Sequence, residues 1–156
     1  MDLTNVSMKR MGAGFSLVEL LVVFTIMAAV ALFAIVGFKD YAHIQQYDAA
    51  VATVKSTLID TRVRARSAEL DQSYGVKILT SSLVVFRGTT YSAGASTNET
   101  VSVTGGTLSS SLTGGTDQII FNKLTGLPNA TGTITMIGAE HLATTTLTIT
   151  GSGVIQ

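Results

Sequence analysis

Cysteine is absent from this sequence, and charge of either sign is not in excess. Without cysteine there are no disulfide bonds, no thiol chemistry and no thiolate metal sites, so the folded part must be held by packing or by assembly. Ten basic and ten acidic residues give a net charge of zero. The chain therefore has no large basic field that would recruit nucleic acid.

Residues suited to catalysis or metal binding are equally sparse. The two histidines, His43 and His141, lie far apart in the sequence, and few carboxylates surround either of them. Asp117 and Glu140 are isolated carboxylates, too few for the roughly six to eight oxygen ligands that calcium takes. No Gly-x-Ser-x-Gly nucleophile elbow occurs. We therefore predict no catalytic residue, no metal and no cofactor, in a protein that is not an enzyme.

One long apolar run dominates what is present. Residues 20–38 contain no charged residue and a single hydroxyl group, that of Thr25. As a helix these residues would cover about 29 Å, close to the hydrocarbon thickness of a bilayer, so we predict a membrane span. Glu19 stands at its start. Because an acidic residue at membrane depth costs roughly 2.5 to 3.5 kcal/mol, we expect Glu19 to have a partner or a function.

A polar leader, residues 1–14, precedes the apolar run, and its only basic residues are Lys9 and Arg10. The positive-inside rule keeps this end in the cytoplasm. We therefore predict a single-pass protein of the cytoplasmic membrane whose C-terminal domain is exported.

Two alternatives for this segment stay open. Met8 and Met11 are alternative translation starts. An ordinary secretory signal cleaved after Ala31 is the other alternative, because small residues flank that position. Against it, the apolar run is long for such a signal and Glu19 interrupts it.

Beyond the apolar run the pattern becomes amphipathic. Residues 39–74 contain neither proline nor glycine, so we expect one helix from about Phe15 to about Leu70. Its first part, residues 15–38, is the predicted membrane and assembly helix, and residues 39–72 are the amphipathic continuation. One stripe recurs at steps of three and four, as on a helix face that seeks a partner: Ile44, Tyr47, Val51, Val54, Leu58, Thr61, Ala65 and Ala68.

From Tyr74 the period changes to two and glycine becomes frequent, which predicts β-strands. Strands of this kind bury one face, and the helix stripe is the natural cover for it. We therefore predict an α+β fold, a long N-terminal helix packed on an antiparallel sheet made by residues 73–156. Weakly patterned residues 89–98 and 104–116 are predicted as surface loops or edge strands. The predicted strands are residues 76–79, 83–87, 100–104, 118–122, 133–137, 145–150 and 153–156.

The residues around Gly14 match a known pattern. The segment Gly-Phe-Ser-Leu-Val-Glu that begins at Gly14, followed by the apolar run, resembles the class III signal of type IV pilins and pseudopilins. The resemblance implies that a prepilin peptidase cleaves after Gly14 and methylates the new N-terminal amine of Phe15. It also implies that Glu19 is the acidic residue of the mature helix, one turn from that amine.

Opposite charges at Phe15 and Glu19 could then match each other, or Glu19 could match the amine of a neighbouring subunit and set its register. The simpler alternative is that Glu19 only favours the positive helix N-terminus or reaches the membrane interface.

Residues 61–69 resemble the end of the long helix in H-type pseudopilins and FimT-like minor pilins. Major pilins often have a proline inside the membrane helix, whereas the only proline here is Pro128. This absence, with those of a disulfide and of a calcium site, favours a minor subunit.

Some FimT-like minor pilins bind DNA through arginines at the extreme C-terminus. This chain has no basic residue after Lys123. Its densest basic cluster is Arg62, Arg64 and Arg66, but on a helix Arg64 points away from the face that the other two share. We therefore expect nucleic acid not to be a partner.

Together these observations predict a structural subunit, a minor pilin or pseudopilin of a type IV pilus or a type II secretion-like filament. Its expected partners are the prepilin peptidase, other pilin or pseudopilin subunits and the cytoplasmic membrane, before it enters a periplasmic or extracellular filament. The alternatives are a signal-anchored extracellular binding module and a DNA-uptake minor pilin.

Overall fold

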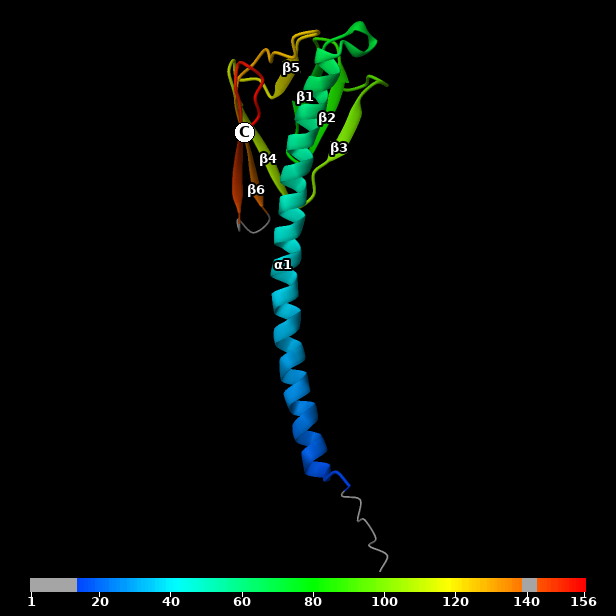
Figure 1. Ribbon diagram of the computed structural model, residues 1–156, viewed down its shortest axis with the longest axis vertical. Helices are drawn as coiled ribbons and strands as arrows, with labels where there is room; N and C mark the ends of the chain where they lie inside the picture. Colours follow the sequence, from blue (N-terminus) through cyan, green and yellow to red (C-terminus); the bar gives the residue numbers. More distant parts are fainter. Residues whose placement is uncertain (1–13, 139–142) are drawn as a thin grey trace, which may run out of the picture. The chain divides into compact units, whose positions relative to one another are not determined.

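A computed structural model describes residues 14–138 and 143–156, and for residues 34–40 it describes the backbone only. The chain divides into two compact units, Met1–Asp40 and Tyr41–Gln156. The described part of the first unit is the beginning of helix α1 (Leu17–Arg66) with three residues before it. The second unit contains the rest of α1 and the β-strands (Figure 1).

The strands form two antiparallel sheets, one of four strands in the order β3-β2-β1-β5 and one of three in the order β4-β6-β7. The predicted α+β class is confirmed. The prediction of one sheet is wrong, because the strands form two. The chain passes from the first sheet to the second at Gly105, where an added Cβ would lie 3.0 Å from the Gln46 carbonyl oxygen of α1. The strands are β1 (Tyr74–Ile78), β2 (Ser82–Arg87), β3 (Glu99–Ser102), β4 (Gly106–Leu112), β5 (Gln118–Phe121), β6 (Gly132–Gly138) and β7 (Thr144–Ile149).

Six of these strands agree with the predicted ones to within two residues at each end. The exception is β4, which falls in a segment predicted only as a loop or an edge strand. It is an edge strand, and it buries Leu108 and Leu112. The predicted last strand, residues 153–156, is reduced to a bridge between Ile155 and Ile149 of β7.

The core of the second unit forms where one face of α1 meets both sheets. Val54 and Leu58 of the helix and Ile119 of the first sheet are fully buried. Ile134 of the second sheet is 1% exposed. All belong to one hydrophobic cluster. The predicted helix stripe is thus confirmed in its middle, whereas Ile44 at its start is 50% exposed.

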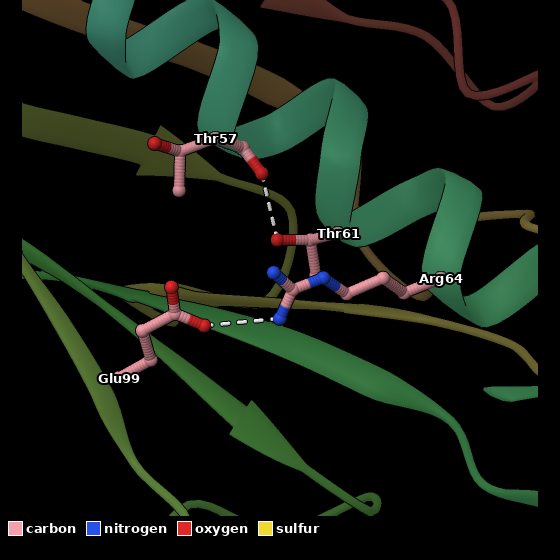
Figure 2. A network of polar contacts seen from close by, with 4 residues as sticks. All are labelled: Thr57, Thr61, Arg64 and Glu99. Carbon is pink, nitrogen blue, oxygen red and sulfur yellow. Dashed lines mark hydrogen bonds and ion pairs between the residues drawn. The ribbon is translucent and has the colours of Figure 1, made fainter. Parts of the chain in front are cut away.

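The stripe contains one polar residue, Thr61, which is 1% exposed. Its hydroxyl donates to the Thr57 carbonyl oxygen one turn earlier, at 2.7 Å (Figure 2). Because this hydrogen bond stays within the helix, Thr61 needs no partner from the sheets and packs as an apolar residue would.

Helix α1 ends at Arg66, so the predicted end near Leu70 is wrong. Ala68 and Leu70 have left-handed backbones, with φ of 53° and 52°, which no helix can continue through. Leu124 supplies the physical reason for the stop, because its N–H donates to the Ala65 carbonyl oxygen of the last turn, at 3.0 Å. A short turn over Glu69–Asp71, which includes the left-handed Leu70, then leads to β1.

Two adjacent helix residues allow a matched test of this core. Leu58→Ala should lower the free energy of unfolding by about 3 kcal/mol, because it leaves a cavity where the helix meets the sheets. Ile59→Ala is the control, since Ile59 is 42% exposed, and should cost less than about 1 kcal/mol. Urea unfolding of the detergent-solubilised chain, followed by tyrosine fluorescence, measures both. Equal losses would mean that the helix face is assigned incorrectly.

Candidate functional site

Gly14 and Phe15 lie in a non-helical, exposed segment directly before α1. Phe15 is 80% exposed. A Cβ added at Gly14 would meet no atom within 4 Å, and the backbone there is not left-handed. The fold therefore gives no reason for glycine at this position, and the peptide bond between the two residues is accessible.

Glu19 lies in the first turn of α1, and its side chain is exposed. The turn begins at Ser16, whose carbonyl oxygen accepts the Leu20 N–H at 3.1 Å. A carboxylate in this turn is favoured by the positive end of the helix dipole. Glu19 is also four residues from Phe15, which lies just outside the helix.

The helix that follows is apolar on all sides. Every large hydrophobic side chain between Phe15 and Phe33 is at least 48% exposed in this unit. Thr25 is the only polar residue among residues 20–33, and its hydroxyl donates to the Val22 carbonyl oxygen at 2.7 Å, so it is satisfied within the helix. A helix of this kind is stable when lipid or other helices surround it.

The predicted membrane span covers residues 20–38, of which the last five lie outside the residues whose side chains are described. Among the helices that are described, none has a stretch long and apolar enough to cross a membrane. The single-pass anchor is therefore not confirmed and stays a prediction.

The family model for the prokaryotic N-terminal methylation motif matches residues 9–35. The chain carries the class III signal of type IV pilin-like proteins and pseudopilins. The matched range includes Gly14, Phe15 and Glu19 and lies within the first unit. The signal implies processing by a prepilin peptidase and assembly with other pilins, and it suggests anchoring in the inner membrane before entry into a pilus. No curated protein and no solved structure gives a significant match to the chain.

The arginines near the end of α1 make different contacts. Arg62 is half-buried, and it donates from Nε to the Gly126 carbonyl oxygen at 3.2 Å and from Nη2 to the Ser152 carbonyl oxygen at 2.8 Å. A Cβ at Gly153 would lie 2.6 Å from the same Nε. Arg62 therefore holds two loops from distant parts of the chain against the helix, a role that its sequence context did not indicate.

Arg64 forms an ion pair with Glu99, with 2.9 Å between Nη1 and Oε2 (Figure 2). The hydrogen bond that Arg64 donates to the Glu99 carboxylate raises the pKa of Arg64 above its ordinary value. Both side chains are more than a third exposed, so solvent screening limits the pair to less than about 1 kcal/mol. With Arg62 and Arg64 engaged inside the domain, the three arginines do not form one basic patch, and Arg66 is the exposed member.

The isolated carboxylates and histidines are not gathered into a site by the described part of the fold. Asp117 is ion-paired with Lys77, and the hydrogen bond between them lowers the pKa of Asp117. Glu140 and His141 lie outside the described residues. Within residues 14–138 and 143–156, no group of three metal-ligating side chains is present.

A cavity of about 280 Å³ lies near the start of the second unit. Tyr47 forms part of its wall, and its hydroxyl donates to the Met136 carbonyl oxygen at 3.1 Å and hydrogen-bonds the Thr145 hydroxyl at 2.8 Å. These bonds fix one side of the cavity. No local sequence pattern could have indicated it, because its walls come from segments about ninety residues apart: His43, Ile44, Tyr47 and Asp48 of α1 with Gly138, Ala143 and Thr145.

The contacts of Arg62 generate a prediction about stability. Arg62→Ala should lower the free energy of unfolding by roughly 1.5 to 3 kcal/mol, because two carbonyl oxygens lose a charged donor. Arg66→Ala is the matched control on the same face and should stay within about 0.5 kcal/mol. Urea unfolding measures both, and hydrogen exchange should report faster opening of the loops at Gly126 and Ser152 in Arg62→Ala only. Similar behaviour of the two variants would contradict this role for Arg62.

Proposed function

We propose that the protein is a structural subunit, a minor pilin or H-type pseudopilin, of a type IV pilus or a type II secretion-like filament. A prepilin peptidase cleaves it after Gly14 and methylates Phe15. Residues 15–38 hold it in the cytoplasmic membrane as a single span, with the second unit exported, and later serve as the assembly helix. The observation that carries this proposal is the accessible bond after Gly14, directly before a helix that is apolar on all sides and has one acid in its first turn.

Cleavage creates the charge that Glu19 needs as a partner. The new amine at Phe15 is a cation, and an isolated cation or an isolated carboxylate is costly in apolar surroundings. Within one subunit the two groups are four residues apart in the sequence, and between subunits the amine of one can meet Glu19 of the next. This second pairing would set the register of neighbouring helices while their apolar surfaces cover each other.

The contacts in the second unit bear on the alternatives. A DNA-uptake subunit needs accessible cations, whereas Arg62 and Arg64 are engaged within the domain. A signal-anchored binding module would keep a membrane helix but would not be methylated at Phe15. N-terminal sequencing and mass spectrometry of the membrane-extracted protein therefore test the proposal directly, and an N-terminus other than methylated Phe15 would reject it.

A larger residue at the cleavage position should block maturation. Gly14→Val should leave the fold unchanged, because a Cβ there meets no neighbour, while the unprocessed precursor accumulates in cells that contain the peptidase. Ser16→Ala, on the other side of the bond, is the control and should be processed. The readout is the N-terminal sequence of each variant. A mature N-terminus at Phe15 in Gly14→Val would refute this assignment.

Loss of the acid should separate processing from assembly. Glu19→Ala should still be cleaved and methylated, but its incorporation into filaments should fall by about tenfold or more, equivalent to ~1.4 kcal/mol. Thr25→Val is the control on the same helix, since the Thr25 hydroxyl is bonded to its own backbone. Immunoblotting of sheared filaments against the membrane fraction measures the ratio, and normal incorporation of Glu19→Ala would count against the register role.

A further inference from the structure

The second sheet has one face that contributes to the core and a second face on its other side. Leu108, Ile134 and Leu147 belong to the core cluster, so the residues that alternate with them lie on the second face. Every one of these residues except Ile137 carries a hydroxyl group, and we name this surface the hydroxyl face. Its hydroxyl residues are Thr107, Ser109 and Ser111 of β4, Thr133 and Thr135 of β6, and Thr144, Thr146 and Thr148 of β7.

The strand register aligns these hydroxyl groups in rows. Pairing continues without a bulge over seven residue pairs between β4 and β6 and over six between β6 and β7. Neighbouring positions in a row are therefore about 4.8 Å apart, and successive rows are about 6.8 Å apart. Two complete rows cross the sheet, one of Ser109, Thr135 and Thr146 and the next of Ser111, Thr133 and Thr148.

Most of these hydroxyl groups have no internal partner. The Ser109 hydroxyl donates to the Thr135 carbonyl oxygen at 3.5 Å, and none of the other seven bonds to another described residue. Six of the eight residues are exposed, and Thr133 and Thr135 are half-buried. Because a hydroxyl group both donates and accepts, the face offers both kinds of hydrogen bond to a partner.

The hydroxyl face lacks charge and aromatic rings. No charged or aromatic residue occurs in β4, β6 or β7, whereas the strands of the first sheet contain Lys77, Arg87 and Glu99. Without cations the face cannot neutralise the phosphates of nucleic acid or of anionic lipids. With one apolar residue and no aromatic one, it also lacks the apolar centre of a protein–protein interface.

The size of the face also bears on its partner. Three positions on each of three strands cover about 300 Å² at these spacings. A stable protein–protein interface buries roughly 800 Å² on each partner, so the face is too small for a stable dimer. A long polymer can instead contact many copies of the face at once, and weak contacts then add up to firm binding.

We infer that the hydroxyl face binds a neutral polysaccharide. Such a polymer has no charge, its hydroxyl groups both donate and accept, and its sugar units repeat, which matches the three properties of the face. The inference goes beyond the proposed function and rests on it in one respect, because a filament would supply the many aligned copies that weak contacts need.

The test uses the detergent-solubilised full-length chain, coupled at high density to beads so that many copies act together. Because the sequence has no cysteine, Ala52→Cys supplies a single attachment point at an exposed helix position. The detergent has no sugar group that would compete. The probes are hydroxyethyl cellulose and dextran, which are neutral, and carboxymethyl cellulose, which is anionic. The beads should retain at least one neutral polymer about tenfold more than the anionic one.

Substitutions at the centre of the face separate the hydroxyl groups from the fold. Thr135→Val with Thr146→Val removes two paired hydroxyls at nearly constant side-chain size and should lower retention about fivefold. Thr135→Ser with Thr146→Ser keeps both hydroxyls and is the matched control. Thr135→Lys should lower retention about tenfold, whereas Thr100→Lys, at an exposed position of the first sheet, should not change it. The urea midpoint of each variant reports whether its fold is intact.

The outcomes separate this inference from the proposed function. Retention of neither neutral polymer, or equal retention of the anionic one, would overturn the inference. An equal loss in the valine and serine variants would do the same, since the hydroxyl groups would then not be the contact. A dimer of the uncoupled chain that Thr135→Lys abolishes would identify a second copy as the occupant and also overturn it. The beads need neither peptidase nor filament, so none of these results depends on methylation of Phe15.

Discussion

The packing of one helix face against two sheets is the interaction on which the second unit depends. Val54, Leu58 and Ala65 are fully buried and share one cluster with side chains from both sheets. Each sheet has an apolar face, and the helix is the element that covers both. With no cysteine to crosslink the strands, this packing has to hold the domain together.

The apolar residues of helix α1 are arranged differently in its two parts. Between Tyr47 and Ala65 its apolar residues form a stripe that the chain itself buries, so that part is complete in one molecule. Between Phe15 and Phe33 apolar residues cover every side, and within the described part of the first unit their large side chains are exposed. The second arrangement is favourable only with lipid or other subunits, which links the N-terminal signal to assembly.

Sequence periodicity predicted the α+β class, the helix stripe and the approximate positions of six strands. It did not define β4, because Ser109, Ser110 and Ser111 separate Leu108 from Leu112 and weaken the alternating pattern. It also placed the helix end too late, since no glycine or proline marks Arg66. That end depends on an N–H group of Leu124, far away in the sequence, which bonds the carbonyl oxygen of Ala65.

The sequence by itself determined the features that depend on neighbouring residues: the signal around Gly14, the apolar run, and the stripe that follows it. Tertiary structure alone decided the two carbonyl contacts of Arg62, the cavity beside Tyr47 and the bond from the Leu124 N–H to the Ala65 carbonyl oxygen. Each of these joins α1 to segments about sixty to one hundred residues later. Local periodicity carries no information about such pairs, because it describes which face of an element is apolar and not which distant segment will cover it.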